Sequence, residues 1–150
     1  MTQTVPDSDA LYDRVIVERA RAPQYAGKLE APSVQGEGKN PMCGDKTRVD
    51  IALDATHIQS VRHTTRGCAI CAAAADLMAQ QVSGLDVAQA VSLSGRFSAM
   101  LVGEASPAAT ADTSLGPLEV FQPLRSHKAR IRCAELPWIA LKEALSHADV

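Results

Sequence analysis

The sequence predicts an α+β fold in which a small antiparallel β-sheet packs against several α-helices. Three observations predict it: an amphipathic helical segment opens the chain, alternating β segments follow, and most of the remainder has a helical pattern. With 150 residues, 46% apolar residues and a net charge of −2, the chain can bury a core without disulfide support. We expect one domain over residues 8–150, preceded by a disordered tail over residues 1–7.

The first helix is expected to start at Asp7 or Ser8, either of which can cap it, and to end before Pro23. Its apolar face would contain Leu11, Tyr12, Val15 and Ile16. Residues 25–40 are rich in glycine and suit a short strand, a loop and a second strand.

A β-hairpin is expected next. Residues 46–54, "KTRVDIALD", alternate between apolar and polar positions, and residues 58–67 provide the returning strand after a turn. Cys43 precedes the first strand and Cys68 follows the second. Because the strands run antiparallel, these two cysteines are expected at the same edge of the sheet.

The second half of the chain is expected to be helical. Helices are predicted over residues 68–84 and 85–104, separated from a last helix within residues 127–147 by an exposed loop over residues 103–117. Pro137 lies inside the last helix and should kink or restart it.

The charge and the apolar runs of the sequence argue against nucleic acid as a partner, against a membrane-spanning segment and against export. Basic side chains are scattered, which argues against nucleic acid as a partner. The longest apolar run, residues 68–75, is too short to cross a membrane, and the acidic N-terminus does not resemble an export signal. We therefore expect a cytoplasmic protein whose four cysteines are metal ligands or reactive thiols rather than disulfides.

The motif "NPMCGDK" places Cys43 and Asp45 on either side of a glycine in a turn. A pair at this spacing can direct a thiolate and a carboxylate at one metal ion. The alternative is an aspartate that caps a turn beside an ordinary small cysteine.

The other cysteines leave similar alternatives open. Cys68 and Cys71 form "CAIC" at a helix start, where the helix dipole favours a thiolate, so either a redox dithiol or two half-buried helix residues is consistent. Cys133 taken alone would be a core cysteine. Together with Asp45, however, Cys43, Cys68 and Cys133 could form a tetrahedral site for zinc or an anchor for an iron–sulfur cluster. His63 is expected on the strand surface.

Four motifs, "LYDRVIVERARAP", "NPMCGDK", "RGCAIC" and "ARIRCAELPW", resemble in this order the U-type iron–sulfur cluster assembly proteins, the SufU, IscU and NifU N-terminal proteins. The resemblance covers residues 10 to 145 and implies a metal site of Cys43, Asp45, Cys68 and Cys133. The SufU branch is the most similar, because Arg132 replaces a histidine typical of IscU and residues 103–124 resemble an insertion of that branch. Arg130 matches a basic position of that branch and is expected to assist a partner or the charge of the site.

The resemblance further implies a function. A zinc-bound protein would accept persulfide sulfur on Cys43 from a PLP-dependent cysteine desulfurase of the SufS type and pass it to downstream scaffold or carrier proteins. The other role in the family is a scaffold for a transient [2Fe–2S] cluster.

Two alternatives remain open beside this resemblance. Cys71 stands where SufU-like members more often have a small residue without a thiol, so a thiol–disulfide oxidoreductase using Cys68 and Cys71 is one alternative. A structural zinc-binding module is the other.

Overall fold

The computed structural model describes residues 8–42, 44–103 and 115–148. The expected tail over residues 1–7 and most of the expected loop over residues 103–117 lie outside these ranges. Cys43 also lies outside them, so its expected place in the site is a prediction that the structure does not test.

The elements confirm the expected α+β fold. The three strands form one antiparallel sheet in the order β1-β2-β3. In chain order the elements are α1 (Ser8–Arg21), β1 (Val34–Asn40), β2 (Asp45–Asp54), β3 (His57–Arg66), α2 (Ala69–Val82), α3 (Val87–Val102), the 3₁₀ helix η1 (Gly116–Ser126) and α4 (Lys128–Ser146).

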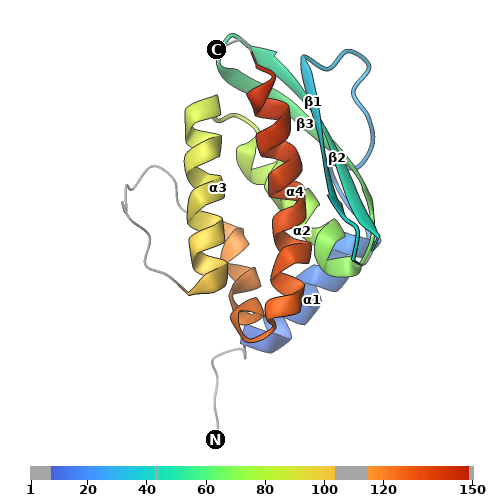
Figure 1. The fold of residues 1–150 in the computed structure, drawn as a ribbon, viewed down its shortest axis with the longest axis vertical. Coiled ribbons are helices and arrows are strands. Elements are labelled where there is room, and N and C mark those ends of the chain that lie inside the picture. The colour runs from blue at the N-terminus through green and yellow to red at the C-terminus, as the bar shows by residue number, and fades with distance from the viewer. Residues whose placement is uncertain (1–7, 43, 104–114, 149–150) are drawn as a thin grey trace, which may run out of the picture.

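Helices cover one face of the sheet, which we call the inner face. The long helix α4 packs on β1 and β2, and α2 packs on β3 (Figure 1). α1 contacts α2, while α3 contacts α4 and η1 on the side away from the sheet. The segment between α1 and β1 runs along the opposite, outer face of the sheet (Figure 1).

The glycines of β1 allow α4 to approach the strand closely. A Cβ atom at Gly36 would collide with the backbone of Ala140 and Ala144, and one at Gly38 would lie 2.7 Å from the carbonyl oxygen of Leu136. This close approach explains why a glycine-rich segment forms a well-packed edge strand. It also fixes the position of α4, which carries Cys133.

The outer face of the sheet is partly covered. Asp50 alternates with the core residues as predicted, yet it is buried, because the segment before β1 closes over it. Its carboxylate accepts hydrogen bonds from the backbone N–H of Leu29 and from the side chains of Gln35 and Arg48. These bonds compensate for the burial of a charge.

The sequence analysis did not predict η1. This helix begins at Gly116, so the expected loop over residues 103–117 ends earlier than predicted. Its buried residues, Leu118, Phe121 and Leu124, recur every third position. A 3₁₀ helix has three residues per turn, and the spacing therefore puts one apolar side chain on the core at each turn.

α4 continues through Pro137 as a single helix, and the expected restart was wrong. Pro137 is buried and is followed by Trp138, whose ring stacks on Phe97 of α3 at a centroid distance of 5.1 Å. Burial of this large aromatic pair offsets the hydrogen bond that a proline removes from a helix interior.

The expected position of His63 on the strand surface was wrong. His63 is buried on the inner face of the sheet, with 2% of its surface exposed. Its Nε2 atom lies 3.0 Å from Asp76 of α2, and its Nδ1 atom lies 2.9 Å from the hydroxyl of Thr65. Asp76 is fully buried and also accepts hydrogen bonds from Arg19 and from the backbone N–H groups of Gln24 and Tyr25. The carboxylate thereby joins α1, the segment after it, β3 and α2.

This network predicts an acid-sensitive stability. Burial alone would raise the pKa of Asp76, but the hydrogen bonds from His63, the two backbone N–H groups and Arg19 outweigh it and lower the pKa from 3.8 to about 2. The unfolded chain therefore binds this proton more readily than the folded one. About 2 kcal/mol of stability, present above pH 4, should be lost as the pH falls from about 4 to about 2. Chemical denaturation of the wild type and of Asp76→Asn between these two pH values measures the free energy of unfolding. The variant should not show this loss of stability.

Within the described ranges, we find no helix whose length and apolar content would allow it to cross a bilayer.

Candidate metal centre

The turn between β1 and β2 is built to place Asp45 at the end of the sheet. Asn40 and Asp45 are paired across the two strands, and the backbone N–H of Gly44 donates to the carbonyl oxygen of Asn40 at 2.8 Å. Gly44 has a φ of 77°, a conformation that favours glycine. The Asn40 side chain also accepts a hydrogen bond from the N–H of Met42. Asp45 starts β2 with its side chain on the inner face.

Three predicted ligands meet at this end of the sheet. Single ligand atoms of Asp45, Cys68 and Cys133 all lie within 4.8 Å of one another. They come from the start of β2, the residue that caps α2, and the second turn of α4. Asp45 is buried, Cys133 is partly buried and Cys68 is exposed, so the group opens to the surface on one side.

The carboxylate of Asp45 indicates that this group suits a cation. Its Oδ2 atom is buried and has no hydrogen-bond partner among the residues that the structure describes, which do not include Cys43. A buried carboxylate oxygen without a partner is costly, and a metal ion would satisfy it. Sulfur atoms around a tetrahedral zinc ion are about 3.8 Å apart, given bonds of about 2.3 Å, so the distances between the ligand atoms would need to shorten by about 1 Å or less to close on a metal.

Sequence reasoning missed Gly67, which supports Asp45. A Cβ atom at this position would lie 2.5 Å from Oδ1 and 2.6 Å from Cγ of Asp45. Gly67 also has a φ of 154°, which L-residues rarely adopt. The glycine before Cys68 therefore leaves the space that the carboxylate occupies. The "RGC" motif was the signal that could have identified it.

A pocket of about 350 Å³ gives access to the cysteines. Cys68, Cys133 and Arg130 line it together with apolar residues of α1 and α2, including Ile16 and Ile70. The guanidinium of Arg130 and the N-terminus of α2 at Cys68 supply positive charge to this pocket, and the carboxylate of Asp13, which also lines it, supplies negative charge. Arg130 thus lines the same pocket as Cys68 and Cys133, and its expected role in the charge of the site stays a prediction.

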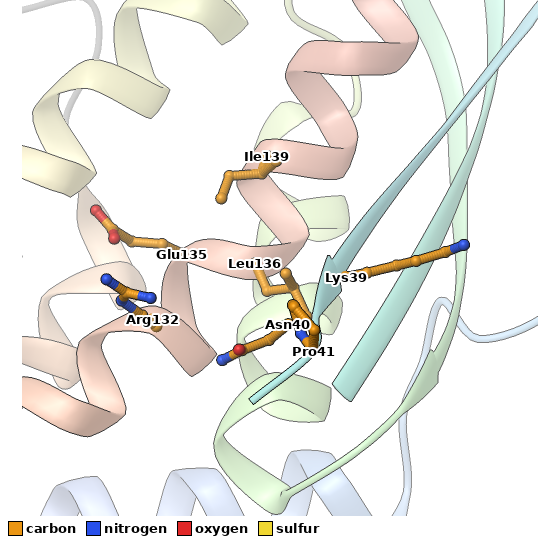
Figure 2. Close-up of a pocket in the computed structure, with 7 residues that line it drawn as sticks. All are labelled: Lys39, Asn40, Pro41, Arg132, Glu135, Leu136 and Ile139. Atoms are coloured by element: carbon orange, nitrogen blue, oxygen red, sulfur yellow. The ribbon is translucent and has the colours of Figure 1, made fainter. Parts of the chain in front are cut away.

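Arg132 and Cys133 are adjacent in sequence but face different pockets. Arg132 lines a second pocket of about 220 Å³ between α4 and the end of β1, together with Asn40 and Leu136 (Figure 2). Figure 2 shows the Asn40 amide directed toward Arg132 in this pocket.

Among the described residues, the group that could hold a metal consists of Asp45, Cys68 and Cys133 and does not include Cys71. Cys71 is fully buried in α2, and its sulfur lies 3.4 Å from the hydroxyl of Thr47 on β2. The interpretation of Cys71 as a buried helix residue is the one that its position supports.

Cys71→Ser tests this interpretation. Serine retains a polar atom opposite Thr47, so we expect a loss of about 1 kcal/mol or less and the same metal content as the wild type. Denaturation and metal analysis of the purified variant measure both. Loss of the metal on this substitution alone would show that Cys71 takes part in the site.

Comparison with known proteins identifies the family. The profile of the NifU-like N-terminal domain matches residues 11–134. The chain belongs to the NifU-like N-terminal domain family. The resemblance inferred from the cysteine motifs is thereby confirmed.

Two known proteins are similar to this chain over nearly its whole length. The zinc-dependent sulfurtransferase SufU of Bacillus subtilis is 33% identical over 141 residues, which are 94% of this chain and 93% of that protein. The iron–sulfur cluster assembly scaffold protein IscU of Streptococcus pyogenes is 30% identical over 92% of this chain and 84% of its own.

A solved structure in the family supports the fold. The crystal structure of a putative iron–sulfur cluster assembly scaffold protein for the SUF system from Fervidobacterium islandicum is similar, with a TM-score of 0.82 and 28% identity. The similarity covers 93% of this chain and 99% of that one. The α+β arrangement is thus that of the family.

Proposed function

We propose that this protein works in iron–sulfur cluster assembly, where it accepts persulfide sulfur on Cys43 from a PLP-dependent cysteine desulfurase. The observation that carries the proposal is the group of Asp45, Cys68 and Cys133, in which the buried Oδ2 atom of Asp45 has no partner among the described residues. Its similarity to a zinc-dependent sulfurtransferase over 94% of the chain supports the same function.

The residues would hold one zinc ion through three thiolates and one carboxylate. Asp45, Cys68 and Cys133 provide three ligands, and Cys43 is proposed as the fourth because it lies two residues before Asp45 in the sequence. Bound zinc keeps the thiols deprotonated and protects them from oxidation. Cys43 is the ligand proposed to leave the group and act as the acceptor.

The sulfur transfer itself is an exchange between thiolates. The Cys43 thiolate attacks the outer sulfur of the persulfide on the desulfurase, and a new sulfur–sulfur bond forms at Cys43. The sulfur–sulfur bond of the donor breaks, and the donor cysteine leaves as a thiolate, so no oxidant or reductant is needed. Arg130, at the pocket of Cys68 and Cys133, would stabilise the negative charge of the persulfide.

The same residues are proposed to hold a nascent [2Fe–2S] cluster as cargo. The similarity to an IscU scaffold protein favours this role. Three cysteines and one aspartate can bind either a zinc ion or a [2Fe–2S] cluster. We propose a desulfurase of the SufS type as the donor, downstream scaffold or carrier proteins as acceptors, and the reducing cytoplasm as the location, where free thiols persist.

The test is a single-turnover sulfur transfer without oxygen. The zinc-loaded protein is incubated with the cysteine desulfurase of the same organism and L-cysteine, and the intact mass is recorded. We expect a gain of one sulfur atom in the wild type and in Cys71→Ser, and none in Cys43→Ala.

Two results would favour the alternatives. No sulfur on the wild type, together with unfolding when zinc is removed, would indicate a structural zinc module. A reducible disulfide between Cys68 and Cys71, with activity lost in Cys71→Ser, would indicate a thiol–disulfide oxidoreductase.

A further inference from the structure

The outer face of the sheet has a row of three cations at the end that carries the metal site. Lys39 of β1 pairs directly with Lys46 of β2, and Lys46 pairs directly with Arg66 of β3. Residues paired across strands point to the same face, so the three side chains form one line across the sheet. We call Lys39, Lys46 and Arg66 the cationic row.

Figure 2 shows how one member of the row, Lys39, is oriented. Lys39 extends away from α4 across the strands, whereas the neighbouring Asn40 points back toward Arg132. Lys46 follows the proposed ligand Asp45, and Arg66 lies two residues before Cys68. The cationic row therefore borders the proposed site on the outer face of the sheet.

Charged side chains elsewhere on the outer face have partners on that face, whereas the three cations of the cationic row have few. In the next two rows of paired residues, Arg48 bonds to Asp50, and Arg62 lies over the ring of Tyr25. In the cationic row, Lys39 and Lys46 share one carboxylate, that of Glu37, at 3.8 and 3.6 Å.

Arg66 is exposed and makes no ion pair with another residue in the described part of the chain. Like charges directly opposite one another destabilise a sheet. Lysine on an edge strand can prevent aggregation, but Lys46 lies on the central strand, where that explanation does not apply.

We propose that the cationic row is the docking surface for a carboxylate-bearing segment of the protein that donates sulfur. The inference rests on the proposed function, because the row borders the site to which a sulfur donor must come. Met42, 86% exposed in the turn that follows Lys39 and Asn40, adds an apolar contact beside the charges. A protein partner suits this combination better than nucleic acid, since the chain as a whole carries a net charge of −2.

The test compares two double charge reversals with the same net charge. Lys39→Glu/Lys46→Glu changes the cationic row, and Lys28→Glu/Lys142→Glu changes two exposed lysines outside it. Binding of each zinc-loaded protein to the desulfurase is measured at about 50 and about 500 mM NaCl. We expect on the order of tenfold weaker binding at low salt for the row variant, little change for the control, and a smaller difference at high salt.

A second probe does not depend on sulfur transfer. A peptide of ten glutamates added to the wild type should shift the backbone NMR signals of Lys39, Lys46 and Arg66 more than those of Lys28 and Lys142.

The outcomes separate this inference from the proposed function. If the wild type accepts sulfur but both double variants bind the desulfurase equally, the docking surface is wrong and the function stands. If the wild type neither binds the desulfurase nor accepts sulfur, the proposed function fails. Loss of zinc from the row variant alone, or a row-dependent affinity for DNA or for phosphatidylglycerol vesicles with unchanged desulfurase binding, would also overturn the docking proposal.

Discussion

Gly67→Ala is expected to weaken zinc binding by about 10- to 100-fold, as changes next to a ligand commonly do. The new methyl group would overlap the carboxylate of Asp45, because the Cβ position lies 2.5 Å from Oδ1. Asp45 would have to leave its place beside Cys68 and Cys133, and the metal would lose its only oxygen ligand. Competition with a chromophoric zinc chelator measures the change in affinity.

Gly27→Ala is the matched control for this variant. Gly27 also has a positive φ, 125°, but a Cβ atom there would meet no atom within 4 Å. The control should therefore lose about 1 kcal/mol of stability through backbone strain and keep its zinc affinity. Equal zinc affinity in Gly67→Ala and Gly27→Ala would contradict the role of Gly67 as the space for Asp45.

Asp76→Asn is expected to destabilise the fold by about 3–5 kcal/mol, the usual range when one partner of a buried charge pair is removed. The asparagine would leave Arg19 without its ionic partner and could not accept all the hydrogen bonds that the carboxylate accepts from His63, Gln24 and Tyr25. Urea denaturation at neutral pH measures the loss.

Asp54→Asn provides the control, since Asp54 is exposed at the end of β2. It should change the stability by about 0.5 kcal/mol or less. The Asp76→Asn protein should still bind one zinc ion while it is folded, because Asp76 is not among the grouped ligands. A stability equal to that of the control would show that the buried network contributes little.

The sequence was sufficient to predict the elements around the site. Alternation in residues 46–54 identified β2, and the antiparallel hairpin was expected to bring Cys43 and Cys68 to one edge. Cys43 lies outside the described residues, but Asp45 does lie beside Cys68 at that edge. The i, i+2 spacing of Cys43 and Asp45, taken alone, favoured a capped turn over a metal site. The structure adds Cys133 of α4, which meets Asp45 and Cys68 in a group that could hold a metal ion.

Other features depend on packing that no local pattern encodes. His63 occupies a strand position with polar neighbours, and on the inner face of the sheet its ring meets Asp76, which comes 13 residues later and lies on α2. Gly67 looks like an ordinary loop glycine until the side chain of Asp45 is placed against it. The cationic row likewise becomes visible only once the register pairs Lys39, Lys46 and Arg66.

The most direct test of the metal site is the metal and acid-labile sulfide content of protein purified without oxygen. We predict one zinc ion per chain, or iron with sulfide, in the wild type and in Cys71→Ser. Asp45→Ala, Cys68→Ala and Cys133→Ala, each checked to be folded, should lose most of it. Full metal content in all three variants, or a folded wild type without metal, would contradict the proposed site.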